Sequence, residues 1–217
     1  MGVKLIWDLD NTLVDVVEHE YELAQITLGE LGIIDTRDNI IKRNPCLWGD
    51  FVRSYGLGEE EFFKVWNALD DRVNGIKNGN IKIYPDTIPV LEKLVCSGYL
   101  LGIASNTPKD RAMIEINALG LYKFFNPKAI SCYDYKMPCK PEPDLALKAL
   151  AGLNYDKEND KVLIIGDTRN DIRAGENLKK LGHNAKTIYI NRHNLNYEAD
   201  YVVSSLEEAY LLIQNGL

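Results

Sequence analysis

The chain has 217 residues, of which 46% are hydrophobic and 26% are charged, and its formal net charge is −7 at pH 7. This balance is typical of a soluble globular protein that buries a sizeable core. The negative charge argues against general binding to nucleic acids or membrane surfaces, because both need a basic patch.

The first apolar run, residues 3–7, is followed at once by acidic residues and is too short for a signal peptide or a membrane span. The four cysteines form neither a C-x-x-C pair nor a zinc-like group. This pattern favours a reduced cytoplasmic protein over one with a disulfide such as Cys132–Cys139.

Strand and helix patterns alternate along most of the chain. The expected strands span residues 3–7, 99–104, 127–131, 161–166, 185–190 and 201–203. The expected helices span residues 87–97, 109–119, 144–153, 170–181 and 206–214. Such alternation predicts an α/β fold with a doubly wound, mainly parallel, Rossmann-like sheet.

One block breaks the alternation, because between about residues 17 and 74 the sequence shows helical runs and no convincing strand. The helical runs span residues 17–31, 38–42, 47–55 and 59–73. We predict a helical cap at residues 17–79, inserted after the first strand of an α/β core formed by residues 1–16 and 80–217. The aromatic residues Phe62, Phe63 and Trp66 of this block are expected to form its core rather than a ligand site.

Polar residues stand where several expected strands end. Asp8 and Asp10 follow the first strand, Ser105 and Asn106 follow residues 99–104, and Asp167 follows residues 161–166. Ligands bind at this end of the strands in open α/β sheets. Side-chain alternation sends Asp8 and Asp10 the same way, where like charges are costly unless a cation relieves them. This favours a divalent metal, although D-x-D pairs also occur in turns and at helix N-termini.

Four motifs lie at the expected strand ends or in the loops near them. They are Asp8-Leu9-Asp10-Asn11-Thr12, Ser105-Asn106-Thr107, Lys140-Pro141 and Gly166-Asp167-Thr168-Arg169-Asn170-Asp171. In this order and spacing, the chain closely resembles the phosphatase branch of the haloacid dehalogenase superfamily over nearly its whole length. The helical insert resembles the small type-1 cap of that family.

The resemblance implies a Mg²⁺-dependent phosphomonoester hydrolase acting on a small soluble phosphate, such as phosphoglycolate, a sugar phosphate or a nucleoside monophosphate. Asp8 would attack phosphorus and form an aspartyl-phosphate. Asp10 would act as general acid and base, and its presence favours phosphoryl chemistry over cleavage of a carbon–halogen bond. Lys140 would neutralise charge on the nucleophile and the phosphate.

The resemblance also implies ligand roles. Ser105 and Asn106 would bind phosphate near a helix N-terminus, with Thr107-Pro108 as N-cap and first-turn proline. Asp8, the main-chain carbonyl of Asp10, and Asp167 would hold Mg²⁺, which prefers hard oxygen ligands. Asp171 would support the water shell of the metal or hold Lys140.

Three residues of the cap are candidates for substrate contact, namely His19, Arg43 and Trp48. Two alternative functions stay open at this point. One is a phosphomutase of the same superfamily that uses Asp8 and Asp10, and the other is a non-catalytic phosphate-binding module.

Overall fold

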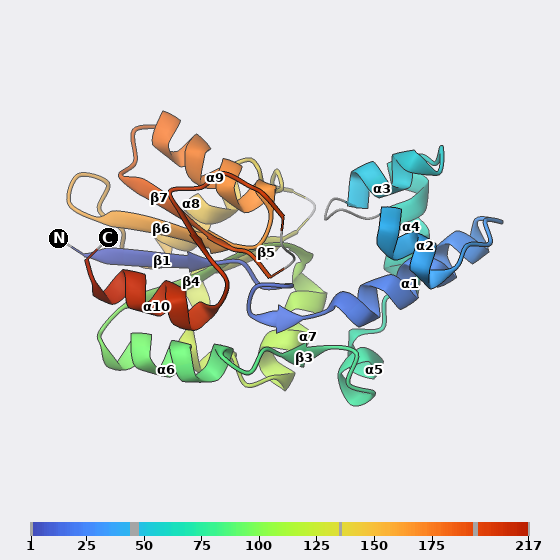
Figure 1. Cartoon of the computed structure of the whole chain (residues 1–217). Coiled ribbons are helices and arrows are strands. Elements are labelled where there is room, and N and C mark those ends of the chain that lie inside the picture. Colours follow the sequence, from blue (N-terminus) through green and yellow to red (C-terminus); the bar gives the residue numbers. More distant parts are fainter. Residues whose placement is uncertain (1, 44–47, 135, 193–194, 217) are drawn as a thin grey trace. The chain divides into compact units, whose positions relative to one another are not determined.

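The computed structural model describes residues 2–43, 48–134, 136–192 and 195–216 (Figure 1). The chain divides into two compact units. Unit 1 combines Met1–Asp15 with Ile83–Leu217, and unit 2 is Val16–Lys82. Within residues 2–43, 48–134, 136–192 and 195–216, no helix is long and apolar enough to cross a membrane.

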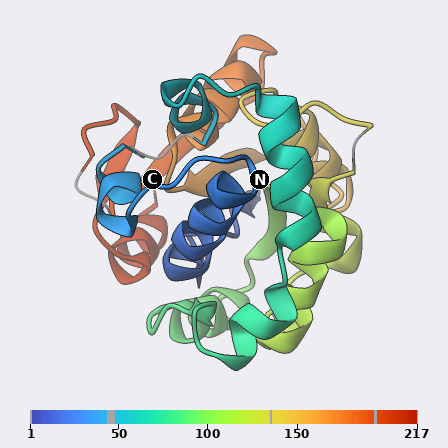
Figure 2. The same ribbon diagram turned by 90° about the vertical axis from the view of Figure 1, so that its right-hand side faces the viewer.

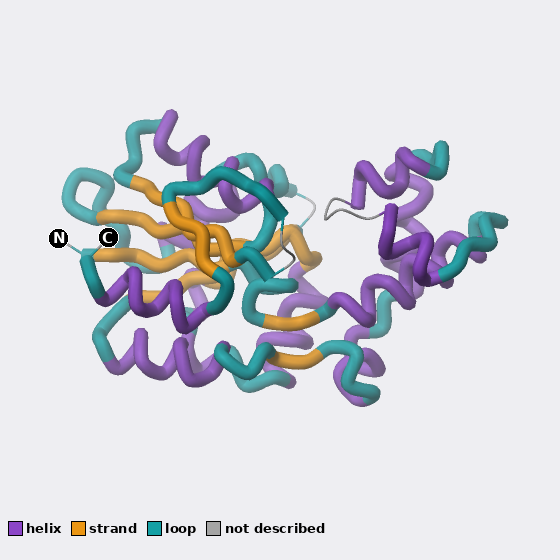
Figure 3. Tube along the Cα trace, viewed as in Figure 1, coloured by secondary structure: helices purple, strands orange, loops and turns teal. Residues whose placement is uncertain are grey.

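Unit 1 is built on a six-stranded sheet in the order β5-β4-β1-β6-β7-β8 (Figures 1 and 3). The strands are β1 (Val3–Trp7), β4 (Leu100–Pro108), β5 (Ile130–Tyr133), β6 (Lys161–Gly166), β7 (Ala185–Ile190) and β8 (Tyr201–Val203). Neighbouring strands pair in parallel throughout. The predicted Rossmann-like α/β class is therefore confirmed, with β1 between β4 and β6.

Helices cover both faces of this sheet. They are α6 (Thr87–Cys96), α7 (Lys109–Ala118), α8 (Asp144–Ala151), α9 (Arg169–Lys180) and α10 (Leu206–Gln214). Figure 1 shows α8 and α9 on one side of the sheet and α6 and α10 on the other. The sheet is therefore buried on both faces, and Leu5, Ile6 and Trp7 of β1 are 0% exposed. This explains why β1 has a continuous apolar sequence.

The strand expected at residues 127–131 begins later than predicted. Pro127–Ala129 form a 3₁₀ turn, in which the Asn126 side chain accepts a hydrogen bond from the main-chain N–H of Lys128. The strand itself is Ile130–Tyr133. Proline has no N–H to contribute to a ladder, so the pairing starts only beyond it.

Unit 2 is mainly helical (Figure 2). Its helices are α1 (Val17–Glu30), α2 (Arg37–Arg43), α3 (Trp48–Ser54), α4 (Glu59–Leu69) and α5 (Arg72–Lys77). Its core includes Phe51, Phe62 and Trp66, as expected for the aromatic residues of this block. Two short strands that the sequence did not reveal, β2 (Val14–Asp15) and β3 (Lys82–Ile83), pair where the chain leaves and rejoins unit 1.

The helix expected at residues 59–73 is in fact two helices. It breaks at Asp70, whose ψ of 98° is extended rather than helical. The Asp70 carboxylate, 1% exposed, lies 2.7 Å from His19 Nε2 and accepts a hydrogen bond from Arg72 Nε at 3.0 Å. A buried charge cluster therefore ties α1 to the start of α5.

We expect Asp70→Asn to lower the free energy of unfolding by about 3 kcal/mol near neutral pH, because it removes a buried carboxylate that pairs with the buried Arg72. Burial alone would raise the pKa of Asp70, but His19 and Arg72 lower it below its usual value. The stabilisation is thus complete above the unfolded pKa of about 3.9 and is lost as pH falls through the lower folded pKa.

Denaturant unfolding of the wild type and of Asp70→Asn between about pH 6 and pH 2 tests this expectation, with the exposed Asp38→Asn as the matched control. The stability difference between wild type and Asp70→Asn should shrink at the acid end. A constant difference across this range would contradict the assignment.

Candidate active site

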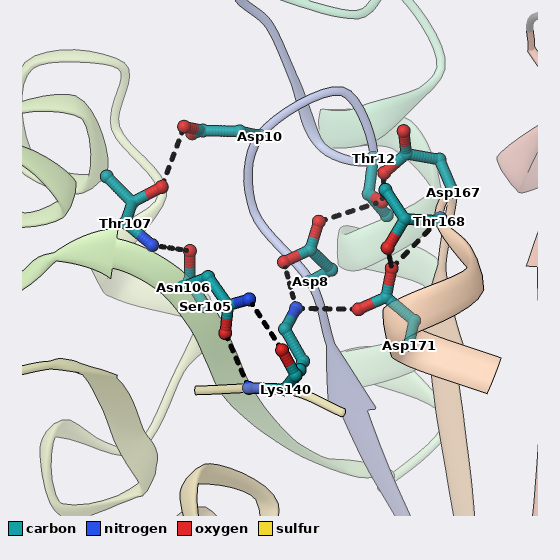
Figure 4. A network of polar contacts seen from close by, with 10 residues as sticks. All are labelled: Asp8, Asp10, Thr12, Ser105, Asn106, Thr107, Lys140, Asp167, Thr168 and Asp171. Atoms are coloured by element: carbon teal, nitrogen blue, oxygen red, sulfur yellow. Dashed lines mark hydrogen bonds and ion pairs between the residues drawn. The ribbon is translucent and has the colours of Figure 1, made fainter. Parts of the chain in front are cut away.

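The motif residues meet at the carboxyl edge of the sheet in unit 1 (Figure 4). Asp8 follows β1, Ser105 lies in β4, and Asp167 follows β6. Lys140 precedes α8 and Asp171 lies in the first turn of α9. Because β1 lies between β4 and β6, strand ends that are distant in sequence are adjacent in space.

Lys140 is the centre of a buried network. Its Nζ donates to Asp8 Oδ1 at 2.5 Å and to Asp171 Oδ1 at 2.6 Å, and its side chain is 4% exposed. Burial alone would lower the pKa of Lys140, but the charges of Asp171 and Asp8 raise it above the usual value. The two carboxylates in contact with Lys140 therefore favour its charged form.

Three carboxylates crowd together beside Lys140. Asp8, Asp167 and Asp171 are 8%, 3% and 2% exposed, and each offers an oxygen within 4.8 Å of the others. Burial and neighbouring acids raise the pKa of Asp8 to about 7, although Lys140 opposes this. Burial and the charges of Asp8 and Asp171 also raise the pKa of Asp167 well above its usual value.

This donor set fits a divalent cation. Three buried carboxylates beside one ammonium leave an excess of negative charge, which a cation would relieve. The donors are all hard oxygen atoms, which are the ligands that Mg²⁺ prefers. The charge balance of these residues therefore agrees with metal binding at this position.

Two threonines that the sequence analysis gave no role hold the acids in place. Thr12 Oγ1 donates to Asp167 Oδ1 at 2.8 Å and lies 3.4 Å from Asp8 Oδ2. Thr168 donates to Asp171 Oδ2 from its main-chain N at 3.0 Å and from its hydroxyl at 2.6 Å. Gly166 makes room for this arrangement, because a Cβ there would lie 2.2 Å from Asp171 Cγ.

The Asn106 side chain holds the main chain of Lys140. Its Oδ1 accepts from Lys140 N at 2.7 Å, and its Nδ2 donates to Lys140 O at 3.0 Å. This role was not found from sequence, because the two residues lie 34 positions apart and no local pattern links them. Its predicted contact with phosphate stays a prediction.

Asp10 lies outside the carboxylate cluster. Because β1 ends at Trp7, regular strand alternation does not extend to Asp10, and the carboxylates grouped within 4.8 Å of Asp8 are those of Asp167 and Asp171. Asp10 Oδ2 accepts a hydrogen bond from Thr107 Oγ1 at 2.8 Å. Figure 4 shows the two carboxylates extending toward different partners.

The expectation that Thr107-Pro108 begins a helix is wrong by one residue. β4 continues through Pro108, which is the N-cap of α7, and the helix starts at Lys109. Thr107 therefore has an extended backbone that directs its side chain to Asp10 rather than to a helix N-terminus.

The three predicted substrate contacts of the cap make contacts within unit 2. His19 pairs with Asp70 as described above, and Arg43 Cζ lies 4.9 Å from the centre of the Tyr55 ring. Trp48 packs on Phe51 and Trp66, with ring centres 5.1 and 4.8 Å away. Their role in specificity stays a prediction.

The described cysteines, Cys96, Cys132 and Cys139, are free thiols, so Cys132 and Cys139 do not form the disulfide considered above. Cys46 lies outside the described residues.

The raised pKa of Asp8 has a consequence for stability. The native state keeps the Asp8 proton up to about pH 7, whereas the unfolded chain loses it near pH 4. The stabilisation from neutral Asp8 is therefore present below about pH 4 and is lost as pH rises toward 7. Asp8→Asn should accordingly raise the free energy of unfolding of the metal-free protein at pH 8 by about 1–2 kcal/mol.

Denaturant unfolding in a chelator at about pH 8 and pH 5 measures this gain, which should shrink at the lower pH. The control is Glu176→Gln on the exposed face of α9. If Asp8→Asn were no more stable than wild type at pH 8, the charged Asp8 carboxylate would not destabilise the metal-free protein.

Comparison with known proteins identifies the family of the chain. Residues 5–180 match the family of haloacid dehalogenase-like hydrolases. Pyrophosphatase PpaX of Listeria monocytogenes is 27% identical over 97% of this chain and 96% of its own. Phosphoglycolate phosphatase of Aquifex aeolicus is 30% identical over 79% of each chain. The solved structure of a haloacid dehalogenase-like family hydrolase from Streptococcus pneumoniae has a TM-score of 0.75 at 22% identity, covering 99% of each chain. The chain belongs to the haloacid dehalogenase-like hydrolase family.

Proposed function

We propose that this chain is a Mg²⁺-dependent phosphatase that transfers a phosphoryl group from a small soluble substrate to Asp8 and then to water. The observation that carries the proposal is the buried Lys140 ammonium in contact with Asp8, beside carboxylates able to hold a divalent cation. The names of the relatives, a pyrophosphatase and a phosphoglycolate phosphatase, support phosphate compounds of this size as substrates.

The first step is attack of an Asp8 carboxylate oxygen on phosphorus, which forms an acyl phosphate and breaks the bond to the leaving oxygen. Lys140 keeps the Asp8 carboxylate oriented and offsets negative charge as the phosphate approaches. Mg²⁺ held by Asp8, Asp167 and the main-chain carbonyl of Asp10 would supply further positive charge at the phosphate. Asp171 supports this arrangement by fixing Lys140.

Asp10 transfers a proton in both steps. It donates a proton to the leaving oxygen when the acyl phosphate forms, and it accepts a proton from the water that cleaves it. Its position outside the carboxylate cluster suits this role, because a proton-transfer group has to face the leaving oxygen rather than the metal. Ser105 and main-chain N–H groups beside Asn106 would bind phosphate oxygens.

We also propose that unit 2 acts as a cap that sets substrate choice and excludes water. The chain enters unit 2 shortly after Asp10 and returns through β3, so the insertion interrupts unit 1 next to the catalytic segment. A helical insert at that position is suited to close over a substrate. His19, Arg43 and Trp48 remain our candidates for specificity residues.

The purified protein should release inorganic phosphate from p-nitrophenyl phosphate, and from phosphoglycolate or pyrophosphate, in Mg²⁺ but not in excess chelator. Asp8→Asn should abolish this turnover because the nucleophile is lost. Asp10→Asn should lower kcat by about 10²–10⁴-fold because proton transfer is lost. Asp110→Asn, an exposed residue of α7, controls for the change in charge.

Other outcomes of this assay separate the alternatives. A phosphomutase would need a bisphosphate activator and would return an isomeric phosphate rather than free phosphate. A protein that binds phosphate without turning over any member of a broad phosphate panel would be a non-catalytic module. An unchanged kcat in Asp10→Asn would remove Asp10 from the mechanism.

Thr12→Val should weaken Mg²⁺ binding by about 10–100-fold, because partners that orient a metal ligand typically contribute this much. The substitution removes the hydroxyl that donates to Asp167 while keeping the shape of the side chain. Calorimetric titration of the metal-free protein measures the affinity, and Thr12→Ser, which keeps the hydroxyl, should bind nearly as tightly as wild type. Equal weakening in both variants would point to packing rather than the hydrogen bond.

A further inference from the structure

We propose that the Thr107 hydroxyl orients Asp10 for proton transfer to the leaving oxygen, which makes Thr107 a positioning residue for the reaction. This inference rests on the proposed function, because it concerns one step of that chemistry. It assigns a role to a residue whose sequence position indicates only the start of a helix.

The contact joins two distant parts of the chain. Thr107 Oγ1 donates to Asp10 Oδ2 at 2.8 Å, although the residues are 97 positions apart. Thr107 is itself held, because its main-chain N donates to Ser105 Oγ at 3.1 Å. A β-branched side chain on extended backbone has few rotamers, so the hydroxyl is well placed before substrate binds.

The extension of β4 to Pro108 explains the geometry. The register of β4 against β5 shifts between Ser105 and Pro108, so this end of the strand is irregular. Asn106 contacts the main chain of Lys140, and its neighbour Thr107 contacts Asp10. One strand end thereby holds two different groups of the site, the cation on one side and the proton-transfer acid on the other (Figure 4).

Asp10 forms an isolated bridge with Val14 in the loop that follows β1. Asp10 lies beyond the end of β1 and is followed by Asn11, which has a left-handed φ of 60°. The Thr107 hydroxyl donates to Oδ2 and so holds one oxygen of this carboxylate.

The proton balance is complete within the two steps. In the first step the Asp8 oxygen–phosphorus bond forms, the bond to the leaving oxygen breaks, and the proton of Asp10 moves to that oxygen. In the second step water displaces Asp8 from phosphorus, and a water proton returns to Asp10. Thr107 neither gains nor loses a proton, because its hydroxyl only donates a hydrogen bond.

Leaving-group dependence tests this role, because an alkyl oxygen needs protonation to depart whereas p-nitrophenolate leaves readily without it. Thr107→Val removes the hydroxyl and keeps the shape, and Thr107→Ser keeps the hydroxyl. We expect Thr107→Val to lower kcat for phosphoglycolate by about 10-fold or more, with a much smaller loss for p-nitrophenyl phosphate. Thr107→Ser should restore turnover of both substrates.

Two further readouts separate positioning from structural damage. The inhibition constant of inorganic phosphate should be unchanged in Thr107→Val, because the role concerns proton transfer rather than phosphate binding. The double variant Asp10→Asn/Thr107→Val should be no slower on phosphoglycolate than Asp10→Asn alone, since residues that act as a unit are not additive.

Equal losses on the two substrates, or an additional loss in the double variant, would overturn the inference and leave the proposed function standing. Wild-type turnover in Thr107→Val on the alkyl phosphate would do the same. If phosphoglycolate is a poor substrate, another alkyl phosphate that the wild type hydrolyses takes its place. A wild type that hydrolyses no phosphate with Mg²⁺ would overturn both the proposed function and the inference.

Discussion

The candidate site depends on the contact of Lys140 with Asp8 and Asp171. Three acids as buried as those at this strand edge could not all ionise without a counter-charge nearby. Lys140 supplies one positive charge, and the raised pKa values of Asp8 and Asp167 show that it does not neutralise the cluster. The remaining negative charge makes the metal-free site unfavourable and favours the binding of a divalent cation.

The fold makes this costly arrangement possible by fixing each group from a different element. β1 and β6 deliver Asp8 and Asp167 side by side, and the main-chain N–H of Asp8 bonds to Ile165 O at 2.8 Å. The start of α9 fixes Asp171 through Thr168, and the end of β4 fixes Lys140 through Asn106. These four groups are therefore held in position before a substrate binds, which is the condition for electrostatic catalysis.

Much of this could be predicted from sequence because the signals are local. A strand buried on both faces is a continuous apolar run, and the acids that end β1 and β6 mark where the polar edge begins. The contacts that orient the site are not local. The orienting hydrogen bonds come from the side chains of Thr12, Asn106 and Thr107. Their partners lie between 34 and 155 positions away in the sequence. The helix break at Asp70 was missed for the same reason, since its carboxylate is stabilised by His19 from α1.

The D-x-D pair shows what sequence spacing leaves open. Two acids one residue apart suggest a shared environment, but the strand ends before the first of them. Asp8 is held by a cation among other acids, whereas Asp10 is held by a neutral hydroxyl outside that cluster. The contacts of these two identical side chains therefore differ, and the fold rather than the spacing of the pair supplies that difference.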